Sequence, residues 1–306
     1  MTSANTRPYV WMLSGSFSFT LMAEFAHVLT RECDWQLVAV ARAGLVAALA
    51  ALIAAAAGAK LVFWPWRLWV RSVAGSCSMV CTFYAFAKLP AADVLTLTNT
   101  FPIWVAVLSW PLYGQPPGVK LVLAIAVGVV GVVLVEQPHL ESGNAGVYSA
   151  LAAALLTAVA MLGLHSLKGI DPRAIVVHFS GVATVVCLAA YSVGPLKHDL
   201  TGVAAPGVLV RLGAMAVTAT VGQLFLTLAF GGGAPAQVSV VGLSQIVMAL
   251  GFDAWLWGRE VNAVALAGTA LVIAPTAWLL TRPTRKPVTG TATPVTVEPD
   301  QTRVPK

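Results

Sequence analysis

Charged residues are scarce in this chain: of its 306 residues only 10% are charged, whereas 58% are hydrophobic. Soluble globular domains carry about 25% charged residues, because water must solvate their surface. The composition therefore excludes a soluble globular protein of this length. It predicts an integral membrane protein, in which much of the surface faces hydrocarbon.

Cysteine is also scarce, and the few cysteines are not arranged as ligands. Cys77 and Cys81 share a helix face, as core residues commonly do, and Cys33 and Cys187 are far from them in sequence. This spacing fits neither a zinc site nor a disulfide framework. We therefore predict no cofactor, no metal site and no disulfide.

Catalytic and nucleotide-binding motifs are missing as well. The chain contains no His-Glu-x-x-His, no Gly-x-Ser-x-Gly, no paired-aspartate motif and no phosphate-binding loop for ATP. Lys and Arg outnumber Asp and Glu by 18 to 12, but they form no stripe with interleaved aromatic residues. These absences argue against an enzyme, an ATP-driven pump and a nucleic-acid partner.

Long apolar stretches are what the chain does have. Each is continuous rather than alternating and is close to the ~20 residues that a helix needs to cross about 30 Å of hydrocarbon. We predict ten transmembrane helices, at Val10–Thr30, Gln36–Gly58, Leu68–Lys88, Ala91–Tyr113, Gly118–Val135, Gly146–Leu167, Ile175–Val193, Gly207–Phe230, Ala234–Trp257 and Val261–Thr281.

One segment of the chain occurs in two similar copies. Ala85-Phe86 recurs as Ala229-Phe230. The same difference in residue number pairs other identical residues across a helix, a tight turn and a second helix. These pairs are Arg67-Leu68 with Arg211-Leu212, Ala92 with Ala236, Leu112 with Leu256, and Gly114 with Gly258. We therefore predict two copies of a five-helix unit. An odd number of helices per copy makes them inverted repeats.

This duplication divides the chain into five parts. We expect a short cytoplasmic N-terminus at 1–9, a first repeat at 10–135, a linker loop at 136–145, a second repeat at 146–281 and a disordered cytoplasmic tail at 282–306. Basic residues favour cytoplasmic termini, since that orientation places most of them inside. The inside set is Arg7, Lys60, Arg67, Arg71, Lys120, Lys168, Arg173 and the basic residues of the tail.

The residues around the end of the third predicted helix resemble a known family. Phe83–Phe86 is followed by Leu89–Asp93, then by Pro102 within the next helix and Gly114 at its end. This pattern resembles the EamA-type transporters of the drug/metabolite transporter superfamily, and the likeness covers about residues 10–281. Family members usually close the fourth and ninth helices with Gly-Glu, whereas this chain has Gly114-Gln115 and Gly258-Arg259-Glu260.

The resemblance implies a multi-pass carrier, commonly an exporter of small metabolites. Its central cavity would lie between helices 1–4 and 6–9, and helices 5 and 10 would be peripheral. Neutral polar residues near the middle of the helices, together with one arginine, are the candidates for substrate contact, because a buried polar group in a membrane needs a partner. They are Arg42, Tyr84, Thr98, Asn99, Gln223, Ser244 and Gln245.

A few ionisable residues are candidates for coupling or gating. Glu24 and Arg42 lie at similar depth, roughly 9 Å below one membrane face, so they can form an ion pair. A structural pair and a gating or substrate-binding role both remain open. Asp253 lies near Arg259, where an interfacial ion pair and proton coupling are the alternatives. His165 is a further gating candidate, for which a satisfied polar contact is the alternative.

The sequence as a whole predicts a secondary transporter in the plasma or inner membrane. Its partners would be a small-molecule substrate and membrane lipid. A lipid flippase and a non-transporting scaffold are the alternatives: a pocket open sideways to lipid would favour the first, and a sealed bundle the second. Gly128 and Gly131 allow close helix approach, for which a homodimer is one use.

Overall fold

The computed structural model describes residues 6–86, 88–89, 91–114, 116–138, 145–193 and 205–281. The predicted tail at 282–306, most of the N-terminus and most of the linker loop lie outside these residues. Every regular element in the described part of the chain is helical. The helices are α1 (Arg7–Glu32), α2 (Trp35–Ala56), α3 (Trp66–Phe86), α4 (Ala91–Thr98), α5 (Phe101–Tyr113), α6 (Val119–Glu136), α7 (Ala145–Ser166), α8 (Pro172–Val193), α9 (Pro206–Gly232), α10 (Pro235–Gly242), α11 (Ser244–Trp257) and α12 (Ala263–Thr281).

Each apolar stretch predicted from the sequence is helical, and two of them are split into α4–α5 and α10–α11. Within the described part of the chain, 8 helical stretches are long and apolar enough to cross a membrane. α1 and α3 are not among these stretches. Both helices contain several serines and charged residues, which lower their mean hydropathy. The chain is thus an all-α, multi-pass membrane protein.

The break between α4 and α5 has a clear chemical cause. Pro102 lies in the first turn of α5 and has no N–H to continue the hydrogen bonds of α4. Side chains at the break bond to the carbonyls of the preceding turn instead. Thr98 Oγ1 donates to the Val94 carbonyl at 2.8 Å, and Asn99 Nδ2 donates to the Leu95 carbonyl at 2.8 Å. The polar residues therefore stabilise the interruption.

The second broken helix, α10–α11, ends in the same way as the first, α4–α5. α10 and α11 meet at Leu243, whose N–H bonds to the Val240 carbonyl at 3.1 Å. α5 and α11 then end at Gly114 and Gly258, and both glycines adopt a left-handed conformation with φ of 68°. Only glycine adopts this conformation without steric cost, which explains why both positions carry it.

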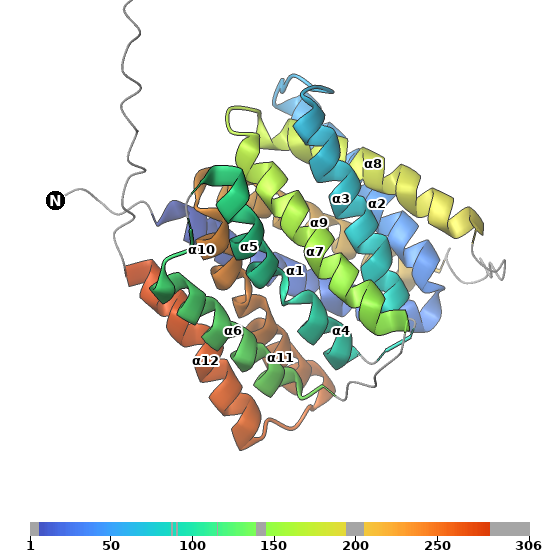
Figure 1. The fold of residues 1–306 in the computed structure, drawn as a ribbon. Helices are drawn as coiled ribbons and strands as arrows, with labels where there is room; N and C mark the ends of the chain where they lie inside the picture. The colour runs from blue at the N-terminus through green and yellow to red at the C-terminus, as the bar shows by residue number, and fades with distance from the viewer. Residues whose placement is uncertain are drawn as a thin grey trace, which may run out of the picture.

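Helices from the first part of the chain pack mainly on helices from the second part. α1 lies along α9, α2 along α8, α3 along α7 and α6 along α12 (Figure 1). Small and hydroxyl residues hold α3 against α7: Ser78 Oγ donates to the Ala153 carbonyl at 2.9 Å, and Ser149 Oγ donates to the Cys81 carbonyl at 2.9 Å. Such interhelical bonds and small residues are a usual means of helix association in membranes.

Glycines set the closest approaches between helices. A Cβ on Gly131 of α6 would lie 2.8 Å from the backbone oxygen of Gly268 on α12, so the two helices touch through their backbones. A Cβ on Gly128 would lie 2.7 Å from the side chain of Leu243. Both glycines predicted as a helix-approach surface therefore face the protein's own chain. A homodimer remains a prediction, but these two glycines are occupied by internal packing.

Side-chain hydrogen bonds join α1 to two other helices at separate places along its length. At the His165 end, Tyr9 Oη donates to Gln237 Oε1 at 2.5 Å, which joins α1 to α10. At the Trp257 end, Trp257 Nε1 donates to Glu24 Oε2 at 2.8 Å, which joins α11 to α1. α1 runs the length of the bundle and is fixed at both ends.

Candidate functional site

Arg71 of α3 is the most unusual polar residue in the described structure, because it is only 1% exposed. Its guanidinium lies over the ring of Phe179 on α8, with Cζ 3.8 Å from the ring centroid. Its Nη2 donates to Gln223 Oε1 on α9 at 3.3 Å. The other two nitrogens, Nε and Nη1, have no hydrogen-bond partner. The guanidinium is thus enclosed by three helices with most of its hydrogen-bonding capacity unused.

Two glycines make room for this side chain. A Cβ on Gly163 of α7 would lie 2.9 Å from Arg71 Cβ, and a Cβ on Gly75 would lie 3.0 Å from Arg71 Nη1. Both distances are shorter than ordinary van der Waals contacts. A side chain at Gly163 or Gly75 would therefore force Arg71 or Phe179 to shift.

His178 extends the cluster along α8. Its Nδ1 forms a hydrogen bond of 2.8 Å with Ser72 Oγ of α3, and its ring meets Trp69 edge to face at 4.6 Å. Its Nε2 has no hydrogen-bond partner. Ser72 directly follows Arg71 on α3, and His178 directly precedes Phe179 on α8, so α3 and α8 meet through two adjacent contacts. We name this group of Arg71, Gln223, His178 and Phe179 the Arg71 cluster.

The sequence prediction counted Arg71 among the basic residues on the cytoplasmic side, but it did not foresee that this side chain is buried between helices. Arg71 follows the start of α3 by more than one turn and faces inward. A signal was available, since Arg71 falls inside the predicted stretch Leu68–Lys88 rather than beside it. A charge within an apolar stretch is a candidate for function by default.

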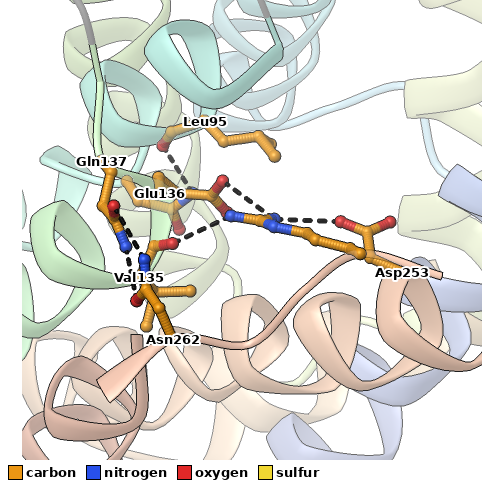
Figure 2. Close-up of polar contacts among 8 residues, drawn as sticks. Leu95, Val135, Glu136, Gln137, Asp253 and Asn262 are labelled. Carbon is orange, nitrogen blue, oxygen red and sulfur yellow. Dashed lines mark hydrogen bonds and ion pairs between the residues drawn. The ribbon is translucent and has the colours of Figure 1, made fainter. Parts of the chain in front are cut away.

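A second arginine lies near the other end of the bundle, and it has two carboxylate partners. Arg259 Nη1 lies 3.1 Å from Asp253 Oδ2 and 3.7 Å from Glu136 Oε2, and its Nη2 donates to the Val135 carbonyl at 2.9 Å. Figure 2 shows the side chains of Asp253 and Glu136 on either side of this guanidinium. The predicted pair of Asp253 and Arg259 is therefore present. Glu136, only 5% exposed, is the partner that sequence reasoning missed.

The predicted ion pair between Glu24 and Arg42 does not form. Glu24 accepts a hydrogen bond from Trp257, whereas Arg42 Nη1 donates to Met79 Sδ at 3.1 Å. The reason is the packing: α1 lies along α9 and α2 lies along α8, so consecutive helices have different neighbours. Similar depth in the membrane therefore did not predict that Glu24 and Arg42 touch.

His165, predicted as a gating residue, joins the two parts of the chain. Its Nδ1 lies 3.1 Å from the Phe230 carbonyl, and its ring meets that of Tyr113 edge to face at 5.2 Å. Tyr113 Oη in turn donates to the Leu162 carbonyl at 3.1 Å. α5, α7 and α9 are therefore held together at this end.

The neutral candidates have different surroundings. Thr98 and Asn99 bond to carbonyls of their own helix, and Tyr84 lies 6.0 Å from the Lys88 ammonium. The buried hydroxyl of Ser244 has no hydrogen-bond partner. The backbone carbonyl of Gln245 accepts a 3.5 Å hydrogen bond from Thr20. Of the neutral candidates, Gln223 is the one that bonds to a charged side chain.

A hollow of about 800 Å³ lies between the α7–α8 turn and α9. Its wall on α9 is apolar, and Asp171 and Arg173 form an ion pair of 3.8 Å in the turn. The lining is therefore amphipathic. The residues that form it are Gly169, Ile170, Asp171, Pro172, Arg173, Val221, Leu224, Phe225 and Leu228.

Apolar helices of membrane length around a buried, poorly paired arginine are typical of a multi-pass membrane protein with a functional polar residue in its interior. Comparison with known proteins identifies the group. The model of the EamA-like transporter family matches residues 6–136. The pseudopaline exporter CntI of Pseudomonas aeruginosa is 30% identical over 215 residues, which cover 67% of this chain and 72% of CntI. The chain belongs to the EamA-like transporters of the drug/metabolite transporter superfamily, and it is a membrane transporter.

Two further comparisons agree. An uncharacterized transporter of Helicobacter pylori is 23% identical over 211 residues, which cover 68% of this chain and 70% of that protein. A solved crystal structure superposes with a TM-score of 0.73 over 86% of this chain and 96% of its own length. Its sequence is only 14% identical, so this likeness concerns the fold alone.

Proposed function

We propose that the protein is a secondary transporter that exports a small polar or amphipathic metabolite by alternating access. The observation that carries the proposal is the contact between Arg71 of α3 and Gln223 of α9. This contact buries a cation where an early helix meets a late one, and most of the cation's donors lack partners. A membrane interior tolerates such a group chiefly on a transport path. The relationship to an exporter supports the outward direction.

The transport mechanism requires two inverted five-helix repeats, at 10–135 and 146–281. The helix pairs support this arrangement. The first helix of one repeat and the third of the other pack together twice, as α1 with α9 and as α7 with α3. The second helices, α2 and α8, pair with each other, and so do the fifth helices, α6 and α12. In this proposal α1 and α3 also cross the membrane, which gives ten spans with both termini in the cytoplasm of an inner-membrane protein.

Alternating access would separate contacts at one end while those at the other close. His165 at one end and Glu24 and Asp253 at the other are the proposed gating residues. His165 and Glu24 hold contacts between the two repeats, with Tyr113 and Trp257, and Asp253 holds Arg259, which contacts Glu136 of the first repeat. Arg42 and the neutral residues Tyr84, Thr98, Asn99, Ser244 and Gln245 remain proposed cavity contacts. The energy would come from an ion gradient or from the substrate's own gradient, because the sequence has no ATP-binding loop.

A lipid flippase is a second candidate, and one observation favours it. The hollow beside α9 combines an apolar wall with the Asp171–Arg173 pair, which suits a molecule with a tail and a polar head. Reconstituted vesicles with a fluorescent phospholipid in one leaflet separate the two candidates. A flippase moves the lipid between leaflets, whereas a metabolite exporter leaves it in place.

The test of metabolite export compares cells that produce the protein with cells that carry an empty vector. Metabolites are measured in the medium and in the cytoplasm. Export predicts a small set of compounds that rise in the medium and fall in the cytoplasm. Identical profiles in both cell lines would contradict the proposed function.

A further inference from the structure

We propose that the Arg71 cluster binds a single carboxylate group of the transported molecule. The inference rests on the proposed transport function and adds the chemical class of the cargo. Arg71 supplies the charge, Gln223 holds the guanidinium from the opposite helix, and His178 offers a second polar contact. The cargo of this carrier is therefore an organic acid or an amino-acid-like molecule rather than a neutral compound or a cation.

The charge of Arg71 is the first reason. Ion pairs among the described residues join Arg173, Arg211 and Arg259 to carboxylates, and none of them includes Arg71. The two neighbours of its guanidinium are a neutral amide and an aromatic ring. A buried charge without a counterion is strongly destabilising, so proteins keep one where a ligand supplies the opposite charge.

The free donors define the ligand more closely. Nε and Nη1 of Arg71 carry N–H groups without acceptors, and a carboxylate offers two acceptor oxygens to a guanidinium. A carboxylate also balances the single positive charge, whereas a phosphate group with a charge near −2 would leave the buried site negative. The chemistry therefore favours a monoanionic carboxylate.

The location explains how binding would be coupled to movement. The backbones of α3 and α9 scarcely approach each other, so the bond between Arg71 and Gln223 spans a gap between the proposed repeats. A carboxylate bound to Arg71 would occupy the place of the Gln223 amide or lie beside it. Binding would thus alter a contact between the moving parts, as coupling requires.

The neighbouring groups suit such a ligand. His178 Nε2 is without a partner, and His178 directly precedes Phe179, whose ring covers the guanidinium. When Ser72 donates its hydroxyl hydrogen to Nδ1, Nε2 carries the proton and can donate to a carboxylate oxygen. Two donors from different helices would then fix the orientation of the carboxylate.

The first experiment identifies the exported compounds in cells that produce the wild-type protein, Arg71→Gln or Lys120→Gln. Lys120 is exposed at the start of α6, so its variant removes one positive charge away from the cluster. We expect every compound that the wild type exports to carry a carboxylate. Arg71→Gln should lower its export at least about tenfold, because a charged hydrogen bond is lost, while Lys120→Gln leaves export unchanged.

A second variant covers the case in which Arg71→Gln does not fold. Gln223→Glu places a carboxylate within reach of Arg71 and imitates the bound cargo. It should raise the unfolding temperature of the purified protein by a few degrees and block export. In the Arg71→Gln background the same substitution should lower the unfolding temperature, because the new carboxylate has no counterion.

The outcomes separate the two proposals. Exported compounds without a carboxylate, or full export by Arg71→Gln, would overturn the carboxylate site and leave the transport function intact. Equal effects of Gln223→Glu in both backgrounds would also overturn it. No exported compound at all would instead contradict the proposed function itself.

Discussion

Arg71 and Arg259 both lie between helices of this protein, but their surroundings differ. Arg259 has two carboxylates and a carbonyl around its guanidinium, and it ties the end of α11 to the end of α6. Arg71 has one amide and one aromatic ring, and two of its nitrogens have no partner. The fold therefore gives Arg259 two counterions and gives Arg71 none.

This difference separates a structural role from a binding role. A fully paired arginine fixes the helices that supply its partners, and it gains nothing from a ligand. An underpaired arginine raises the free energy of the empty protein, and a ligand that supplies the missing acceptors lowers it. Substitution of Arg71 should thus lower export, whereas substitution of Arg259 should lower stability.

The largest effect should come from Arg71→Gln. Removal of the charge should lower export at least about tenfold, since the cargo loses its charged hydrogen bonds. The unfolding temperature should change little, because the empty protein loses an uncompensated charge. Export is measured per amount of folded protein, with Arg259→Gln as the comparison. Equal losses of export in both variants would remove the distinction between the two arginines.

Arg259→Gln should act on stability instead. It leaves the buried Glu136 without its counterion and costs about 2 kcal/mol of unfolding free energy, a value reduced from that of a fully buried pair because Arg259 is partly exposed. Chemical unfolding in detergent measures the change. The double variant Glu136→Gln with Arg259→Gln should recover part of the loss. No recovery would show that the pair contributes little.

Gly131→Val should destabilise the contact of α6 with α12 by about 1–2 kcal/mol, because a side chain there would overlap the backbone of Gly268. This variant also tests whether Gly131 packs within one chain or between two subunits. We expect a lower unfolding temperature with an unchanged oligomeric state, measured by size exclusion with light scattering. Conversion of a dimer into a monomer would instead place Gly131 at a subunit interface.

Trp257→Phe should have the smallest effect. It removes the hydrogen bond to Glu24 but keeps a ring against His27, whose centroid lies 5.2 Å from that of Trp257. A loss below about 1 kcal/mol is expected for one partly exposed hydrogen bond. Thermal unfolding measures it. A loss as large as that of Arg259→Gln would mean that the Trp257 contact also fixes the fold.

The sequence was sufficient to predict the helices, because apolar stretches of membrane length are a strong signal. It also paired Gly114 with Gly258, and both residues adopt the same left-handed conformation. The splitting of two helices was harder to foresee. Pro102 was noticed as an interruption, but the split at Leu243 has no proline, and Gly242 beside it lies against Met12 of α1.

The contacts within the candidate site could not be predicted from depth and spacing. Glu24 and Arg42 have the right depth for an ion pair, yet their helices pack on different partners more than one hundred residues away. Gln223 was predicted as a cavity residue, but its partner Arg71 was used only as a charge that indicates orientation. Only the packing of α3, α8 and α9 brings the two side chains together.

The most direct test of the account is whether the Arg71 cluster can be reached from both sides of the membrane. Thr227 lies one turn along α9 from Gln223, and Thr227→Cys would be made after replacement of the native cysteines. A membrane-impermeant thiol reagent is then applied to right-side-out and to inside-out vesicles. Alternating access predicts labelling of this cysteine in both preparations and protection by an exported carboxylate. Labelling in neither preparation, or in one preparation alone, would contradict a transport path through this cluster.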